Sequence, residues 1–81
     1  MTTHEQAHAE HMERVYAVQR RSAYERVLSK IAYYQNWERD AATDLVPAMD
    51  EEQQRQLTYL RELRESLRRE MIDHGQITAD A

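Results

Sequence analysis

Glycine and proline each occur only once in this chain of 81 residues, at Gly75 and Pro47. A β-sheet or β-barrel of this size needs a turn about every ten residues, and such turns depend on glycine, proline and related residues. The chain has too few of them to connect many strands. The sequence therefore predicts an all-α fold.

The single proline divides the chain into two helical segments. Alanine, glutamate, arginine and glutamine, which favour helices, are abundant before it. Pro47 prevents simple continuation of the first helix, and Asp50 is well suited to cap a second one. We expect a helix at about residues 4–43, a turn at 44–50 and a helix at about 51–74.

These elements predict one helical domain at residues 1–75 and a flexible C-terminal tail at residues 76–81. Because the first helix is the longer, pairing the helices from the turn gives a long helical hairpin with about 15 residues of the first helix overhanging. A break near Ser22 is the alternative. The residues before it would then fold back as a third helix.

Apolar residues recur at helical spacing in both segments. In the first segment a main stripe runs from Met12 to Leu45 through Val27 and Ile31, and a second apolar side includes Tyr33. The second segment has a coiled-coil-like seam at Leu57, Leu60, Leu63, Leu67 and Met71. A chain this small buries only about 60% of its surface, so a single hairpin would be marginally stable. We expect two hairpins to pair as a homodimeric four-helix bundle.

Composition excludes several classes of protein. The formal net charge is −4, with no basic surplus to attract a phosphate backbone. The absence of cysteine excludes disulfides and thiolate metal sites. No apolar run has the length of a membrane span and no signal peptide follows Met1, so we expect a cytoplasmic protein. Phosphate-binding glycine loops and nucleophile or zinc-protease motifs are absent, which argues against an enzyme.

Aromatic and charged side chains are the candidate partner contacts. Tyr33 and Trp37 lie off the main apolar stripe, and Tyr, Trp and Arg contribute much of the binding energy at protein interfaces. Acidic residues of the second helix could meet a protein with a basic surface. The predicted function is a non-catalytic interaction module, a small acidic helical adaptor or inhibitor. Its predicted partner-binding residues are Arg20, Tyr33, Trp37, Glu51, Glu52, Glu62 and Glu65.

Two alternatives remain. His4, His8 and His11 share one helix face, and imidazoles one turn apart can bind zinc or nickel, which predicts a metal-binding helical bundle. No other cofactor is indicated. A nucleic-acid-associated regulator would instead contact phosphates through two arginine pairs, at residues 20–21 and 68–69.

Overall fold

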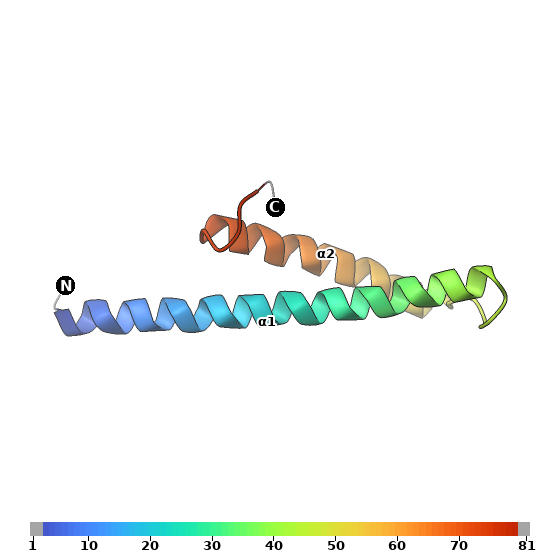
Figure 1. Cartoon of the computed structure of the whole chain (residues 1–81), viewed down its shortest axis with the longest axis horizontal. Helices are drawn as coiled ribbons and strands as arrows, with labels where there is room; N and C mark the ends of the chain where they lie inside the picture. The colour runs from blue at the N-terminus through green and yellow to red at the C-terminus, as the bar shows by residue number, and fades with distance from the viewer. Residues whose placement is uncertain (1–2, 80–81) are drawn as a thin grey trace.

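The computed structural model describes residues 3–79, which form two helices joined by one turn (Figure 1). Helix α1 spans Thr3–Ala42 and helix α2 spans Glu51–Asp73. Within the described range there is no strand, and neither helix is apolar enough over a sufficient length to cross a membrane. The predicted all-α helical hairpin is confirmed.

Helix α1 runs without interruption through Ser22, so the arrangement with a third helix is not found. Its 40 residues include neither glycine nor proline, and nothing in the backbone forces a break. The bounds of both helices lie within one residue of those expected from the sequence.

A small hydrophobic core holds the hairpin together. Val27 and Ile31 of α1 pack with Leu57 and Leu60 of α2, and all four are at least 93% buried. Met71 is also buried, further along α2. Each such side chain contributes about 1.5–3 kcal/mol, so five of them stabilise the fold only modestly. The main stripe of α1 and the leucine seam of α2 therefore meet as their spacing predicts.

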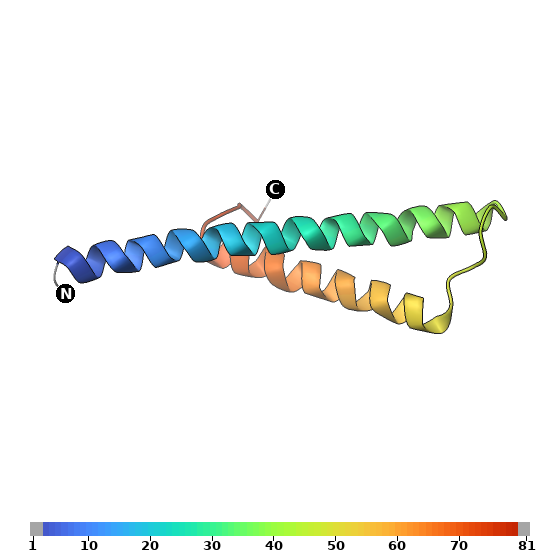
Figure 2. The ribbon, with the colours of Figure 1, turned by 90° about the horizontal axis from the view of Figure 1, so that it is seen from below.

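The first turns of α1 extend well past the end of α2, as Figures 1 and 2 show. Residues 3–11 are all exposed. The molecule measures 63 × 24 × 16 Å and its radius of gyration is 18.0 Å. A compact chain of this length would have a radius of gyration of about 12 Å. The hairpin is consequently an elongated rod with an uncovered end.

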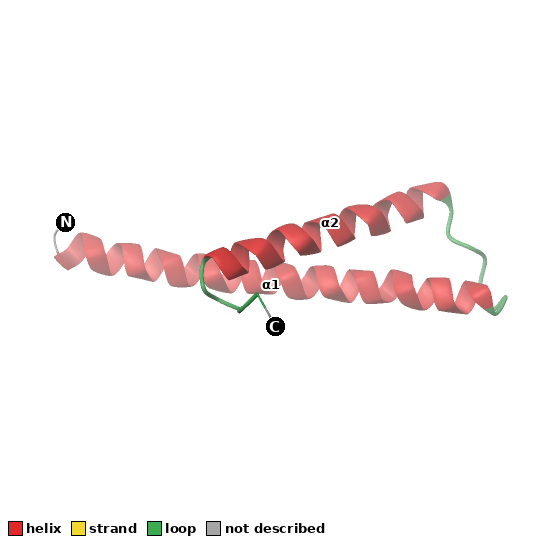
Figure 3. Cartoon of the chain, turned by 90° about the horizontal axis from the view of Figure 1, so that it is seen from above, coloured by secondary structure: helices red, strands yellow, loops and turns green. Residues whose placement is uncertain are grey.

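One loop joins the end of α1 to the start of α2 (Figure 3). It begins with a residue in the left-handed conformation. Asp44 has φ 60°, and the N–H of Leu45 donates to the carbonyl of Asp40 at 3.0 Å. This pattern is a Schellman motif, which usually has glycine at the left-handed position, as α2 has in Gly75 (φ 72°). Leu45, predicted to continue the apolar stripe, is 74% exposed because the helix has already ended.

Helix α2 begins with a capping box. The carboxylate of Asp50 accepts from the N–H of Gln53 at 2.8 Å, and the side chain of Gln53 accepts from the N–H of Asp50 at 2.9 Å. Two otherwise unpaired backbone donors are satisfied in this way. The cap fixes where α2 starts after the turn.

The segment after α2 is attached to α1 at Gln76. Its N–H donates to the carbonyl of Met71 at 2.8 Å, and its side-chain Nε2 donates to the carbonyl of Ala17 at 2.9 Å. The carbonyl of Ala79 accepts from Arg68 at 2.9 Å. Residues 80 and 81 of the predicted tail lie outside the described residues. Gly75 thus turns the chain back toward α1 rather than away from it.

Candidate protein-interaction surface

One side of the hairpin carries an open groove between the two helices, which we call the groove face. The groove has a volume of about 720 Å³. Tyr33 and Tyr59 stand on opposite helices at its edges and are 61% and 59% exposed. Leucines of α2, including Leu63 and Leu67, form its floor, and Lys30 lies on the α1 side. The face combines apolar area with exposed aromatic rings.

Three aromatic residues of α1, Tyr33, Tyr34 and Trp37, form an edge-to-face cluster beside this groove. The ring centroids of Tyr33 and Tyr34 are 5.5 Å apart, and those of Tyr33 and Trp37 are 6.0 Å apart, with interplanar angles of 77° and 89°. The indole Nε1 of Trp37 donates to the carbonyl of Pro47 at 2.7 Å. The indole therefore anchors the turn while remaining partly exposed. Edge-to-face packing holds the rings in defined orientations.

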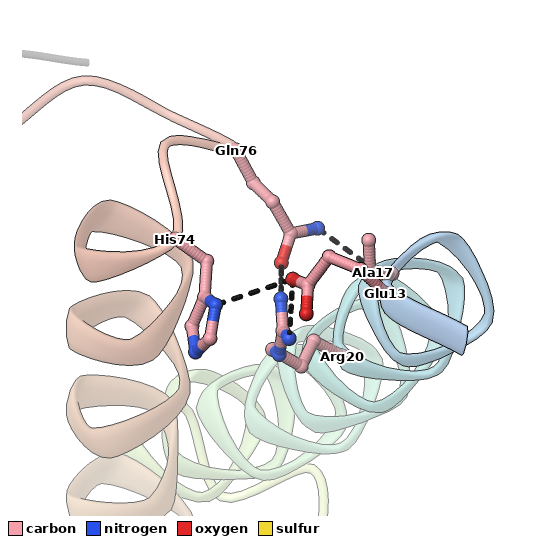
Figure 4. Close-up of polar contacts among 5 residues, drawn as sticks. All are labelled: Glu13, Ala17, Arg20, His74 and Gln76. Carbon is pink, nitrogen blue, oxygen red and sulfur yellow. Dashed lines mark hydrogen bonds and ion pairs between the residues drawn. The ribbon is translucent and has the colours of Figure 1, made fainter. Parts of the chain in front are cut away.

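Four polar side chains join the end of α2 to α1, a group that we call the clasp (Figure 4). One guanidinium nitrogen of Arg20 donates a hydrogen bond to the side-chain oxygen of Gln76. Another donates to the carboxylate of Glu13 at 3.0 Å. The Nδ1 of His74 lies 3.2 Å from the same Glu13 carboxylate. Only 12% of the Arg20 side chain is exposed. The clasp connects residues more than 50 positions apart in the chain.

The clasp also shifts the protonation of its carboxylate. The hydrogen bond from Arg20 lowers the pKa of Glu13 below its ordinary value of 4.5, and the charges of Arg20 and His74 lower it further. Partial desolvation opposes this shift. The clasp therefore favours the ionised form of Glu13.

The acidic residues predicted to bind a partner, Glu51, Glu52, Glu62 and Glu65, are all exposed on α2. By helical periodicity Glu51 and Glu62 lie opposite the buried leucines, and Glu52 and Glu65 lie to either side. Glu65 also approaches Arg68 at 3.9 Å. We call this side of α2 the acidic face.

The predicted contact residues thus fall into three separate places. Tyr33 and Trp37 lie together beside the groove. The four glutamates lie on the acidic face, and Arg20 is used within the chain by the clasp. Sequence spacing could not reveal the last point, because the partner of Arg20 lies 56 residues away.

The sequence interpretation did not include Tyr59 among the contact residues, although it forms one edge of the groove. Its position four residues before Leu63, on the flank of the leucine seam, is the signal that could have identified it. Tyr59 and Tyr33 line the same groove from different helices, and both are exposed.

The histidine face lies on the exposed N-terminal turns of α1, at His4, His8 and His11. Across residues 3–79, no three His, Cys, Asp or Glu side chains are arranged to hold a metal ion. The metal site therefore stays a prediction from spacing alone. The arginine pairs stay so too, since Arg20 belongs to the clasp and Arg68 contacts Glu65 and Ala79.

Comparison with known proteins gives no match to a family model, a curated protein or a solved structure. The groove face, the clasp and the acidic face are therefore interpreted from their own chemistry.

Proposed function

We propose that this chain is a non-catalytic protein–protein interaction module, a small acidic helical adaptor or inhibitor that binds another protein through its helix faces. The observation that carries the proposal is the groove face. Tyr33 and Tyr59 flank an apolar groove and are each more than half exposed. Apolar area of this kind on a small domain is typical of an interaction surface.

The chemistry of the groove favours a protein ligand. Rigid aromatic side chains supply large contact areas at low cost in conformational entropy, and they dominate the energetics of many interfaces. The groove runs between two helices and has leucines at its floor, which is the shape that accepts an amphipathic helix. A helix with apolar residues on one side would contact Tyr33 and Tyr59 together.

The acidic face supports the proposal in a second way. Glu51, Glu52, Glu62 and Glu65 give α2 a negative exposed side, which would attract a protein with a basic surface. Charges at the rim of an interface mainly accelerate association and orient the partner. The groove face would then supply most of the affinity, and the acidic face much of the selectivity.

The module itself is proposed to be a homodimer. Two hairpins that pair along the exposed side of α1 would make a four-helix bundle. Tyr59 on the α2 side of the groove and the acidic faces of both copies would remain available to another protein.

A pull-down from the source lysate with nuclease treatment tests the proposed function. The tagged wild-type chain is compared with Tyr59→Asp, which places a charge at the groove edge, and with Leu28→Asp as the matched control. Leu28 is an exposed apolar residue of α1 that does not line the groove. We expect one nuclease-resistant protein with the wild type and with Leu28→Asp, and at least tenfold less with Tyr59→Asp.

Circular dichroism of the three proteins shows whether each variant keeps its helices. Equal capture by wild type and Tyr59→Asp would contradict the assignment of the groove face. Recovery of the chain alone, with no other protein, would contradict the adaptor or inhibitor function.

A further inference from the structure

The hairpin exposes more surface than a compact protein of its mass. Its accessible surface is 6429 Å² for 9.7 kDa. A compact monomer of that mass exposes about 5,100 Å². The excess, about 1,300 Å² per chain, exceeds the roughly 800 Å² that each partner contributes to a standard protein interface. If each of two copies buried this excess area against the other, the interface would have the size typical of permanent homodimers.

One strip of α1 carries two exposed aromatic residues, Tyr16 and Tyr33, and we call it the open strip. Helical periodicity places its residues on one side of the helix, adjacent to the groove. Its members are Met12, Val15, Tyr16, Gln19, Ala23, Arg26, Lys30, Tyr33 and Trp37. The first three lie at or beyond the end of α2, and the last two form the aromatic cluster. Apolar residues thus occupy both ends of the strip and polar residues its middle.

The charges of the strip discriminate between the two ways in which copies of α1 can pair. In a parallel pair Arg26 and Lys30 would lie against the same residues of the second copy, which is unfavourable. In an antiparallel pair centred at Ala23, Lys30 lies opposite Tyr16, which replaces the Lys30–Lys30 repulsion with a cation–π contact. Arg26 lies level with Arg20, whose guanidinium is bonded to Glu13 and Gln76 of its own chain.

The antiparallel pairing also covers both exposed ends of the strip at once. Counting equally from Ala23, Met12 of one copy lies opposite Tyr33 and Tyr34 of the other. Methionine packs well against aromatic rings. The overhang of each α1, which α2 does not cover, would then lie over the aromatic cluster of the second copy. The small side chain of Ala23 at the centre lets the two helices approach closely.

We infer that the open strip of α1 is the surface on which a second copy of this chain docks, antiparallel, with the two-fold axis near Ala23. This inference rests on the proposed interaction function. It identifies the protein that covers this side of α1 as a second copy of the same chain. The N-terminal overhang of one copy and the Tyr33–Trp37 cluster of the other form each end of the interface.

Cross-linking through single cysteines tests this arrangement, because the natural chain contains none. Ala23→Cys and His8→Cys are each treated with a short bis-maleimide cross-linker. In the inferred dimer the two copies of residue 23 are adjacent. The two copies of residue 8 are separated by about 30 helical residues, or about 45 Å. We expect a covalent dimer with Ala23→Cys and none with His8→Cys.

Molar mass in solution, measured by light scattering, is the second readout. We expect twice 9.7 kDa for the wild type and for the control Leu28→Asp, and 9.7 kDa for Tyr33→Asp. Tyr33 is 61% exposed in the hairpin, so its replacement leaves the core intact. Circular dichroism verifies that the helices persist in each variant.

Three results would overturn the inference: a wild-type chain that stays monomeric at every concentration, cross-linking of His8→Cys to itself, or a dimer in which Ala23→Cys is not linked. None of these results decides the proposed function. The pull-down, which compares how much of another protein the wild type and Tyr59→Asp capture, tests that function separately. A dimer that captures no other protein would contradict that function and leave the inferred pairing intact.

Discussion

The two ends of the hairpin are held together by different chemistry. At the turn, the connection is covalent, the neutral indole of Trp37 donates to Pro47, and the carboxylate of Asp50 caps α2 with Gln53. At the other end no chain connects the helices, and the clasp around Arg20 takes that place. The hydrogen bond from Trp37 to Pro47 is therefore expected to respond little to pH, whereas the clasp depends on charge.

The difference shows where a two-helix protein needs specific polar contacts. Four core residues lie in the middle of the hairpin, and the covalent turn limits how far the helices separate at that end. At the far end no covalent connection limits how far α2 moves from α1, and Met71 is the buried apolar residue there. A network between Glu13, Arg20 and Gln76 restricts that movement while keeping each polar group paired.

The clasp end can be broken by removing its central donor. Arg20→Met keeps a long side chain but eliminates the contacts to Glu13 and Gln76. Hydrogen bonds to charged groups contribute about 1.5–3 kcal/mol each, and solvent access to Glu13 reduces this, so we expect a loss of about 2 kcal/mol. Urea unfolding measures the change. Arg21→Met, at the neighbouring exposed position, is the control, and its free energy of unfolding should fall by less than about 0.5 kcal/mol.

Amide hydrogen exchange localises the same effect. With Arg20→Met, exchange should accelerate in residues 68–74 and stay unchanged in residues 51–57. Uniform acceleration along α2 would show that the two ends are not independent.

The turn end can be weakened by removing one neutral donor. Trp37→Phe keeps an aromatic ring beside Tyr33 and loses the hydrogen bond to the carbonyl of Pro47. We expect a loss of about 1 kcal/mol in the free energy of unfolding, equal at pH 7 and at pH 4. The matched control is Tyr33→Phe, which changes a nearby exposed ring. An effect of Trp37→Phe that depends on pH would contradict the neutral character of this hydrogen bond.

The turn end can also be strengthened. Asp44 occupies a left-handed position with φ 60°, where glycine is favoured and where α2 uses Gly75. We expect Asp44→Gly to raise the free energy of unfolding by about 0.5–1 kcal/mol, because it removes the strain of a side chain in this conformation. Thermal unfolding followed by circular dichroism tests this. Asp44→Ala provides the comparison and should be less stable than the natural chain.

Acid should weaken the clasp end. Because the pKa of Glu13 is lowered in the folded chain, the unfolded chain binds a proton more readily. The contribution of Glu13 to stability is therefore present above its ordinary pKa of 4.5 and is lost as pH falls through the lower folded value. The stability difference between wild type and Glu13→Gln should shrink between pH 6 and pH 3, roughly. An equal difference at both values would mean that the charge of Glu13 does not stabilise the fold.

Much of this fold follows from local sequence rules. The lack of glycine and proline sets the length of α1, and Asp50 with Gln53 sets the start of α2. Periodic spacing selects Val27 and Ile31 as core residues. These rules operate over a few residues, so they can be applied without knowing the tertiary structure.

The candidate surface is less predictable because it depends on contacts distant in sequence. The spacing of α1 predicts Arg20 as a partner contact but cannot reveal its hydrogen bond to Gln76, 56 residues away. The exposure of Tyr59 depends on how α2 is rotated against α1, which the leucine seam specifies only approximately. Leu45 fits the apolar spacing of α1, yet the turn at Asp44 removes it from the helix.

The central claim is that protein covers the side of α1 that carries Tyr33 and Trp37, and the emission of the single tryptophan tests it most directly. Trp37 fluorescence is recorded across a dilution series in which light scattering follows the molar mass. We predict an emission maximum that moves to shorter wavelength as the chain associates, because the exposed part of the indole leaves water. An emission spectrum that does not change while the mass doubles would show that association uses another surface.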